Sequence, residues 1–456
     1  MQAMTIEDVL KATGGTLLSG DVHQTFNDVI SDSRKVTAGV LFVPLVGEKF
    51  DGHEFIKAAF DLGASAVLTQ RDTELLVDKT IVKVEDTLKA FGDIAKYYKQ
   101  KYNVPTVSVT GSVGKTTTKD MLASVLSQKY NTLKTMGNFN NEIGLPITIF
   151  GLEKEHEAAV LEMGMNHFGE IEHLADIGRP DVAVITNIGQ SHIENLGSRE
   201  GIFKAKKEMT KLFTKDNTLI VNGDDDYLSK TKGMGEYKVV YYGITNPEND
   251  VYAKDIENNG LNGIKFTAVV DGGEYPIEVN VPGKHNVYNA LAAICVGREF
   301  DVPMDKIAEG IRSFELTKMR LAVEEYNGIT IINDCYNASP DSIKAALGVL
   351  ADTDKNRKVA ILGDVLEMGD FAKDAHYNLG KAVKENGVDL LITAGENMKY
   401  LAQGAKDNGV ENIVSFDKTL EVCNYVKDEI KSGDAVLIKA SRGMHFEEVY
   451  NTIKNK

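Results

Sequence analysis

A β-branched run that leads into a glycine turn, a lysine and three threonines constrains the fold of this chain most. The stretch reads Val107-Ser108-Val109-Thr110-Gly111-Ser112-Val113-Gly114-Lys115-Thr116-Thr117-Thr118. Small residues let successive backbone N–H groups face a polyphosphate, Lys115 can reach its outer phosphates, and Thr116 can hold Mg²⁺ at the start of the following helix. A plain strand-to-helix turn could carry Gly-x-x-Gly, but not readily the trailing Lys-Thr-Thr. The stretch therefore predicts a nucleotide-phosphate site, although Val109 stands where the general phosphate-loop pattern has glycine.

Size and charge limit the possible folds and partners. The chain has 456 residues, more than one hydrophobic core usually organises, so two or three domains are expected. Its 51 basic and 67 acidic residues give a formal charge of −16, which disfavours a nucleic-acid or anionic-membrane partner. Cys295, Cys335 and Cys423 are widely spaced, with no Cys-x-x-Cys pair for zinc and no disulfide framework, which fits a reducing cytoplasm.

The sequence predicts neither a targeting segment nor a membrane anchor. Residues 1–15 place Glu7, Asp8 and Lys11 in a short amphipathic helix and lack the apolar core of a signal peptide. No run elsewhere approaches the roughly eighteen consecutive apolar residues of a membrane span. We therefore expect a cytoplasmic protein without a membrane span, and we expect a monomer.

Apolar periodicity predicts an α/β protein of three domains, at residues 1–104, 105–315 and 316–456. The first is a small α/β module that ends in a charged helix at 88–102, and Asn103-Val104-Pro105 then interrupt the helical pattern. The second is a mostly parallel sheet with helices on both faces, and Asn-Gly and Gly-Gly turns between 237 and 281 append β-hairpins to it. The third is Rossmann-like. The expected strands are 106–110, 158–161, 182–186 and 218–221 in the central domain, and 329–332, 359–362, 390–393 and 435–438 in the C-terminal domain; a helix is expected at 286–299.

Polar residues at the ends of predicted strands are candidates for chemistry, because ligands of open α/β sheets gather at the carboxyl ends of the strands. Glu162 directly follows the apolar run 158–161, which puts its carboxylate beside the phosphate loop, where it suits Mg²⁺ held against phosphate oxygens. A solvated strand-end acid is the plain alternative. Asn187 and His192 follow the next strand, but a lone loop histidine is more often structural.

Further candidates lie on the next predicted helix and in the third domain. Lys204, Lys206 and Lys207 share that helix, and spacing alone distinguishes none of them from a solvated basic face. The third domain contributes Arg320 and the run Asp334-Cys335-Tyr336-Asn337-Ala338-Ser339-Pro340, straight after a predicted strand. An acid and an amide at a strand end bind ribose hydroxyls or a base edge, but they also make ordinary turns and helix caps. Both interpretations stay open on the residues alone.

These motifs, in this order, resemble the Mur ligases, the ATP-dependent amide-forming enzymes of peptidoglycan precursor synthesis, and the resemblance covers nearly the whole chain. Residues 110–117 match the family's phosphate loop, with Val113 in place of the usual Asn or Ser. The run 283–291 also falls in family order. The resemblance implies that Asn286 and Asn289 approach the adenine, and that Arg320 and Asp334 serve the phosphates and the ribose.

The resemblance implies three overlapping sets of residues at the nucleotide. The ATP-binding set is Thr110, Gly111, Ser112, Val113, Gly114, Lys115, Thr116, Thr117, Asn286, Asn289, Arg320, Asp334 and Asn337. The implied Mg²⁺ ligands are Thr116, Glu162, His192 and Lys206, with Lys206 carbamylated by CO₂. The implied catalytic residues are Lys115, Glu162, His192, Lys206 and Arg320.

Within the family, the stretches 137–146, 362–369 and 438–444 favour the ligase that joins D-alanyl-D-alanine to UDP-N-acetylmuramoyl-tripeptide. Residues 32–36 and 47–53 resemble a UDP-binding module that is shared with the ligase for the third peptide residue. The Asp-Asn-Pro-Arg donor signature of that other ligase is absent here. The implied substrate-binding residues are Ser33, Arg34, Gly47, Asp51, Gly52, His53, Asn138, Asn140, Asn141, Lys439 and Arg442.

The reaction implied by the resemblance passes through an acyl phosphate, formed when the acceptor carboxylate attacks the γ-phosphate of ATP, and the dipeptide amine then attacks the acyl carbon. A third-residue ligase and a folylpolyglutamate-synthetase-like ligase are alternative enzymes. A nucleotide-gated binding protein without ligation is the alternative from another class. The UDP-like module argues against a folylpolyglutamate synthetase, and the complete catalytic set argues against a binding protein. Lysine and diaminopimelate at the third peptide position are not distinguished.

Overall fold

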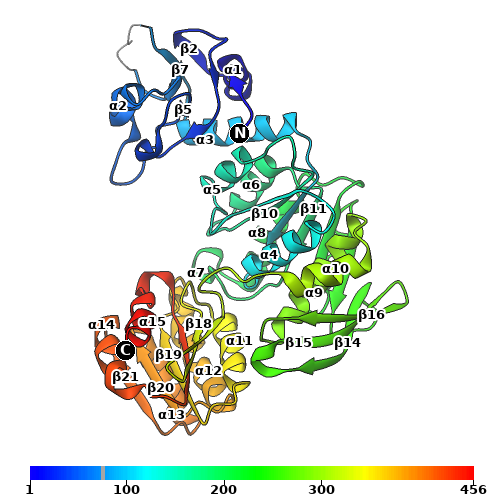
Figure 1. The fold of residues 1–456 in the computed structure, drawn as a ribbon, viewed down its shortest axis with the longest axis vertical. Coiled ribbons are helices and arrows are strands. Elements are labelled where there is room, and N and C mark those ends of the chain that lie inside the picture. Colours follow the sequence, from blue (N-terminus) through cyan, green and yellow to red (C-terminus); the bar gives the residue numbers. More distant parts are fainter. Residues whose placement is uncertain (73–77) are drawn as a thin grey trace.

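The computed structural model describes residues 1–72 and 78–456, and its secondary structure forms three groups that follow one another along the long axis of the molecule (Figure 1). The sheets of the first group precede Pro105. The nine-stranded sheet of the second lies between residues 106 and 279, and the six-stranded sheet of the third between 322 and 439. This architecture confirms the predicted α/β class. The exact domain limits stay predictions.

The N-terminal group is a small α/β unit with a five-stranded sheet of order β2-β7-β6-β5-β4 and a separate β1-β3 pair. The predicted amphipathic helix is α1. It begins after Thr5, whose Oγ1 accepts a hydrogen bond from the N–H of Asp8, and it ends at Gly14, whose φ of +67° suits glycine. The elements are β1 (Met4–Thr5), α1 (Ile6–Thr13), β2 (Thr16–Ser19), β3 (Thr25–Phe26), β4 (Val29–Ile30), η1 (Ser33–Lys35), β5 (Leu41–Phe42), η2 (Gly52–Phe55), α2 (Ile56–Asp61), β6 (Ala66–Thr69), β7 (Thr80–Lys83) and α3 (Thr87–Lys101).

The central group is a nine-stranded sheet of order β16-β15-β14-β13-β12-β11-β8-β10-β9, parallel from β9 to β14. Its strands are β8 (Thr106–Thr110), β9 (Thr132–Lys134), β10 (Ala158–Glu162), β11 (Val182–Ile185), β12 (Thr218–Asn222), β13 (Lys238–Gly243), β14 (Val251–Asn258), β15 (Ile264–Val270) and β16 (Gly273–Val279). The helices include α4 (Lys115–Leu126), α5 (Gly144–Phe150), α6 (Glu170–Gly178), α7 (Ile193–Leu196), α8 (Arg199–Lys207), η3 (Glu208–Thr210), α9 (His285–Glu299) and α10 (Met304–Ser313).

The predicted hairpins differ from the structure in one respect. Strands β14, β15 and β16 do form antiparallel hairpins, with turns near Asn259-Gly260 and Gly272. Strand β13, which falls in the same predicted region, instead pairs in parallel with β12 and β14. The hairpins therefore extend the main sheet, because β13 connects them to it.

The C-terminal group is a six-stranded sheet of order β17-β18-β22-β19-β20-β21 in which only the β17–β18 pair is antiparallel. The strands that sequence analysis left out, β9, β17 and β21, all lie at sheet edges, where polar residues interrupt the apolar run. The elements are β17 (Ala322–Tyr326), β18 (Ile329–Asn333), α11 (Pro340–Ala351), β19 (Arg357–Gly363), η6 (Gly369–Phe371), α12 (Ala372–Glu385), β20 (Leu390–Ala394), α13 (Met398–Asp407), β21 (Ile413–Phe416), α14 (Thr419–Glu429), β22 (Asp434–Lys439), η7 (Arg442–Met444) and α15 (Glu447–Lys454).

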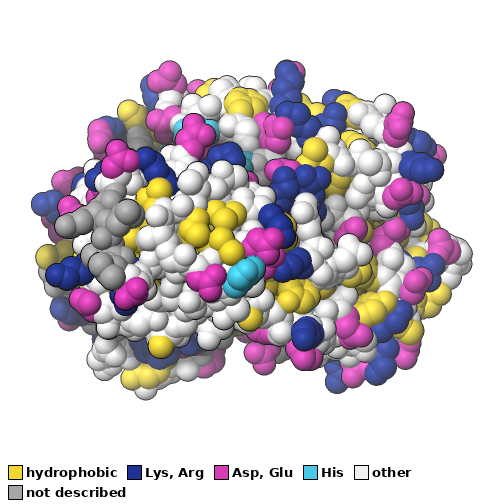
Figure 2. Space-filling view, turned by 90° about the horizontal axis from the view of Figure 1, so that it is seen from above, with side chains coloured by type: hydrophobic (Ala, Val, Ile, Leu, Met, Phe, Trp, Pro, Cys, Tyr) yellow, Lys and Arg dark blue, Asp and Glu magenta, His cyan; other side chains and the backbone are white. Residues whose placement is uncertain are grey.

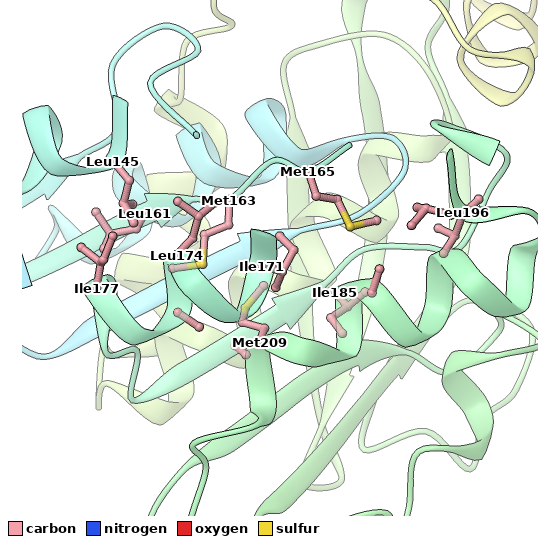
Figure 3. Packing of buried hydrophobic residues seen from close by; sticks show 14 of the residues in the cluster. Leu145, Leu161, Met163, Met165, Ile171, Leu174, Ile177, Ile185, Leu196 and Met209 are labelled. Carbon is pink, nitrogen blue, oxygen red and sulfur yellow. The ribbon is translucent and has the colours of Figure 1, made fainter. Parts of the chain in front are cut away.

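Helix α6 covers one face of the central sheet and fixes the strands that carry the candidate site. Figure 3 shows Ile171, Leu174 and Ile177 of this helix packed with Leu161 of β10 and Ile185 of β11, and all five side chains are buried. Removing so much apolar surface from water stabilises the sheet, at roughly 25 cal/mol per Å². The carboxyl ends of β8, β10 and β11 therefore have fixed relative positions.

The surface of the described residues mixes both charges. Figure 2, an end-on view, shows Lys and Arg side chains interspersed with Asp and Glu rather than gathered on one side of this face. No helix in the part of the chain that the structure describes has the length and apolar character needed to cross a membrane.

Candidate active site

The phosphate loop connects β8 to α4, and its shape depends on two glycines. Gly114 has a φ of +84°, a left-handed conformation that favours glycine. A Cβ on Gly111 would lie 1.8 Å from Oγ1 of Thr186, so no larger residue fits there. The Lys115 amine folds back to donate to the carbonyl oxygen of Gly111 at 2.9 Å. These features support the predicted loop and place the lysine over it.

Asn187, one of the candidates from the sequence, forms hydrogen bonds that hold the phosphate loop in place. Its Oδ1 accepts from the backbone N–H of Val113 at 2.9 Å, and its Nδ2 donates to the Val113 carbonyl, also at 2.9 Å. Its own carbonyl accepts from the N–H of Ser112 at 3.1 Å. The β11 loop thus sets the shape of the phosphate loop.

Glu162 ends β10 and is buried, with a relative exposure of 1%. Its Oε1 accepts from Nδ2 of Asn140 at 2.8 Å, whereas its Oε2 is buried and forms no hydrogen bond to a described residue. Burial lowers the pKa of the nearby Lys115; the negative charge of Glu162 opposes this effect, and the positive charge of Arg320 reinforces it. The carboxylate and the loop lysine therefore belong to one electrostatic group.

Burial separates Lys206 from its neighbours on α8, which spacing did not. The Lys206 side chain is 1% exposed, whereas Lys204 is exposed and lies 2.6 Å from Glu200 in an ion pair. Burial, and after it the charge of Lys115, hold the pKa of Lys206 well below its ordinary range. No carboxylate of the described chain forms an ion pair with Lys206, so its neutral amine form is favoured.

His192 faces the C-terminal domain. Its Nδ1 lies 2.5 Å from Oε2 of Glu367, in the loop after β19. Both residues have left-handed φ angles, +62° each, which are uncommon outside glycine. Contact with His192 holds the pKa of Glu367 below its usual range. This pairing could not be predicted from the sequence, because Glu367 belongs to a different domain.

Arg320 reaches the phosphate loop from the connection between the central and C-terminal domains. Its Nη2 donates to Oγ1 of Thr116 at 3.4 Å, and its guanidinium carbon lies 4.0 Å from the centre of the Tyr336 ring. Its Nε is buried and forms no hydrogen bond with the described residues. The connection between the two domains therefore adds a cation to the loop.

Asp334 and Lys439 bind one another at the ends of β18 and β22. Asp334 accepts from the N–H of Leu321 through Oδ1, at 3.1 Å, and forms an ion pair with Lys439 through Oδ2. Lys439 also donates to the carbonyl of Asn337 at 3.0 Å. Since Lys439 is 1% exposed and already paired, Arg442 is the more available of the two predicted cations.

The asparagines at the start of α9 are already hydrogen-bonded to the protein. Asn286 donates to the carbonyl of Pro282 at 2.7 Å, and Asn289 donates to Oδ1 of Asn286 at 2.8 Å. Oδ1 of Asn289 accepts from the hydroxyl of Thr118 at 3.0 Å. The bond between Asn289 and Thr118 connects α9 to α4, a structural role that the sequence did not indicate.

The predicted substrate residues are distributed over three regions, one in each group of elements. Asn140 holds Glu162, and Asn141 caps the backbone of the loop before α5, while Asn138 is exposed. Arg442 is half-exposed, and its Nη1 lies 3.2 Å from Oε1 of Glu447.

The residues predicted for the UDP-like module lie in the N-terminal group, at the opposite end of the molecule from the C-terminal sheet (Figure 1). Asp51 accepts from the N–H of His53 and also contacts its ring nitrogen at 2.7 Å, while Arg34 pairs with Asp32. Ser33, Gly47 and Gly52 belong to the same two segments. These residues therefore form a region separate from the phosphate loop.

A cavity of about 830 Å³ lies between the central and C-terminal domains. Its walls include residues 112–117 together with His192, Asn286, Asn289, Arg320, Asp334, Asn337, Lys439 and Arg442, whereas Thr110, Gly111, Glu162 and Lys206 lie outside its lining. The cavity is also lined by three acids that were not predicted from the sequence, Asp224, Asp225 and Asp226. They lie just after the end of β12. The rule that ligands gather at strand ends would have selected them. The cavity joins groups of both domains.

The arrangement defines a nucleotide-dependent enzyme in which a second α/β domain completes a phosphate-loop site. Three family models match the chain: Mur ligase family, catalytic domain, at residues 26–99; Mur ligase middle domain at 109–297; and Mur ligase, glutamate ligase domain, at 319–442. The chain belongs to the Mur ligase family.

The chain is similar to named ligases over nearly the full length of each. The UDP-N-acetylmuramoyl-tripeptide--D-alanyl-D-alanine ligase of Bacillus subtilis is 39% identical, over 98% of this chain and 97% of that protein. A crystal structure of MurF from Acinetobacter baumannii, 30% identical, covers 100% of both chains with a TM-score of 0.92. MurF of Thermotoga maritima, solved in complex with ADP, is 28% identical and covers 94% of this chain and 97% of its own, with a TM-score of 0.84.

His285, the first residue of α9, leads to a prediction about pH. Burial holds its pKa at about 4, although Asp334 opposes this effect and Lys439 adds to it. In the unfolded chain the imidazole binds a proton near its ordinary pKa of 6.5. The free energy of unfolding should therefore fall as pH drops from 6.5 to 4, by up to about 3 kcal/mol from this group, at about 1.4 kcal/mol per pKa unit.

The measurement is the thermal midpoint of unfolding at several pH values for the wild type, His285→Gln and His23→Gln. The first variant should flatten the profile between pH 6.5 and 4, and the exposed His23 serves as the control. Equal slopes in all three proteins would contradict the assignment.

Proposed function

We propose that this protein is an ATP-dependent ligase that joins D-alanyl-D-alanine to UDP-N-acetylmuramoyl-tripeptide through an acyl phosphate. The observation that carries the proposal is the meeting of Lys115 and Thr116 of the central domain with Arg320 of the C-terminal side. Such a pair of cations suits the charge that develops during phosphoryl transfer. The choice of substrates is supported by the named relatives, which match along almost the entire chain.

In the proposed reaction the protein positions and neutralises charge. The acceptor carboxylate attacks the γ-phosphorus of ATP, the bond to the β-phosphate oxygen breaks, and ADP leaves with the electron pair. The dipeptide amine then attacks the acyl carbon of the acyl phosphate, and the tetrahedral intermediate expels inorganic phosphate as the amine loses its proton. Lys115 and Arg320 would offset the phosphoryl charge, and the phosphate-loop amides would hold the nucleotide.

In this proposal a Mg²⁺ ion would be held by Thr116, Glu162, His192 and a carbamylated Lys206. Within residues 1–72 and 78–456, no group of three or more His, Cys, Asp and Glu side chains is arranged to hold a metal unaided. The buried Oε2 of Glu162 offers one hard oxygen ligand. The lowered pKa of Lys206 favours a neutral amine, which can attack CO₂, lose a proton and become an anionic carbamate. When bound, Mg²⁺ would supply positive charge that offsets the negative charge of the phosphates.

Location and assembly are also part of the proposal. We place the enzyme in the cytoplasm, supported by three buried cysteines that are all free thiols. Its state as a monomer stays a prediction.

One panel of reactions tests the function. Phosphate release is measured with UDP-muramoyl peptides of different lengths, each combined with D-Ala-D-Ala or with single amino acids. Release should require the tripeptide acceptor and the dipeptide together. Preference for a dipeptide acceptor and a single amino acid would favour the third-residue ligase, whereas nucleotide binding without phosphate release would favour a binding protein.

Lys115→Ala should reduce ligation by about a hundredfold or more, because the phosphoryl group loses a cation that offsets its growing charge. The exposed Lys204 provides the control Lys204→Ala. Turnover and the thermal midpoint are measured together, and near-normal turnover in a folded Lys115→Ala protein would overturn the phosphate-loop assignment.

Lys206→Ala should lower turnover by about a hundredfold, since it removes a proposed metal ligand, and formate or acetate should restore part of it by supplying a carboxylate. Lys207→Ala, on the adjacent position, should remain active. Full activity of Lys206→Ala, or loss of activity only in Lys207→Ala, would show that a different lysine has this role.

Arg442→Lys should raise the KM for D-Ala-D-Ala by about tenfold and leave the KM for ATP unchanged, because lysine lacks the planar fork that binds a carboxylate through two hydrogen bonds. If Arg442 only forms an ion pair with Glu447, the KM for D-Ala-D-Ala will be the same in Arg442→Lys as in the wild type.

A further inference from the structure

The interdomain linker, residues 314–321, runs along the helix that follows the phosphate loop. Its two ends are anchored to different domains: Phe314 is buried in the central core, and the N–H of Leu321 donates to Asp334 of the C-terminal domain at 3.1 Å. Between them, the hydroxyl of Thr317 donates to Oδ2 of Asp120 at 2.6 Å, and Arg320 reaches Thr116. The linker thus contacts α4 twice.

The two contacts match the repeat of the helix. Thr116 and Asp120 are four residues apart and lie on the same side of α4, about 6 Å apart along its axis. Thr317 and Arg320 are three residues apart in the linker; Thr317 contacts Asp120, and Arg320 contacts Thr116. Fixing Thr317 at the second turn of the helix therefore limits where Arg320 can lie at the first.

Asp120 is a rigid anchor for this contact. It is 3% exposed, and its Oδ1 lies 3.0 Å from the amine of Lys119 and 2.9 Å from that of Lys134, so its buried charge is balanced. Burial would raise the pKa of Asp120, but Lys119, Thr317 and Lys134 together hold it below the usual range. The acceptor is thus ionised, and a hydroxyl donates strongly to an ionised carboxylate.

The backbone of the linker is strained in the conformation that brings Arg320 to α4. Met319 and Leu321, on both sides of Arg320, have φ angles of +60° and +49°. Bulky side chains rarely adopt this left-handed conformation, which persists only where surrounding contacts impose it. The hydrogen bond from Thr317 is one such contact, placed immediately before the strained segment.

We propose that Asp120 and Thr317 form a positioning pair, which holds the linker against α4 so that Arg320 lies at the nucleotide phosphates. This inference rests on the proposed nucleotide site but not on the identity of the peptide substrates. Neither residue lines the cavity between the domains, so both act through Arg320 rather than by touching a substrate.

The test compares Thr317→Val, which keeps the shape and removes the hydroxyl, with Thr317→Ser, which keeps the hydroxyl. Thr317→Val should reduce turnover or ADP affinity by about tenfold, the effect of losing one hydrogen bond to a charged group, and Thr317→Ser should restore it. Thr452→Val, at a helix hydroxyl that donates to the carbonyl of Glu448, is the control. Thermal midpoints are measured for all variants.

A double-mutant cycle separates positioning from a purely structural role. In an Arg320→Ala background, Thr317→Val should cause little further loss, because the residue through which it acts is gone. Equal losses in both backgrounds, or a lowered midpoint without a change in ADP affinity or turnover per folded protein, would overturn the proposal. Since ADP affinity needs no peptide, a failure here is distinguishable from a failure of the ligase assignment, which leaves ADP binding intact.

Discussion

Concentrated positive charge at the phosphate loop is the constraint on which the site depends. A chain with a formal charge of −16 places Lys115 and Arg320 at one loop, close to the amine of Lys206. Burial lowers the pKa of both lysines; the charge of Arg320 lowers the pKa of Lys115 further, and the charge of Lys115 lowers that of Lys206. Glu162 offsets part of this charge. Cations held in a poorly solvated site interact strongly with a polyphosphate, because the local dielectric constant is low. The same charged groups therefore determine both how the nucleotide binds and how the catalytic side chains are arranged.

Contacts away from this charge cluster also set the orientation of the C-terminal domain. Nδ2 of Asn258, at the end of β14, donates to Oδ2 of Asp352 at 2.8 Å, and a Cβ on Gly283 would lie 3.0 Å from the side chain of Val349 on α11. The linker itself contains left-handed residues, which cost on the order of 1 kcal/mol or more each. The observed orientation thus depends on contacts at the cavity and at the β14 end, rather than on the preference of the linker.

The sequence predicted the elements whose signal is local. Apolar runs identified β8, β10, β11 and β12 and the inner C-terminal strands, whereas the edge strands β9, β17 and β21 are short and only partly buried, so their signal is weaker. At the site, residue type and strand ends identified Lys115 and Glu162. Spacing could not separate Lys206 from Lys204, because only tertiary burial distinguishes them, and the pairings of His192 with Glu367 and of Lys439 with Asp334 join distant segments. The roles of these residues stay predictions.

Helix α4 connects the separate requirements of the site. Its first turn bears Lys115 and Thr116, Thr118 binds Asn289 of α9, Asp120 binds Thr317 of the linker, and Ser124 donates to the carbonyl of Gly310 in α10. These contacts follow one another along a single rigid element with 1.5 Å between residues. A nucleotide bound at the first turn would therefore lie on the same helix as the contacts with α9 and with the linker, which reaches the C-terminal domain through Leu321. Thr116 and Asp120 of this helix therefore connect the nucleotide site of the central domain to the segment that leads into the C-terminal domain.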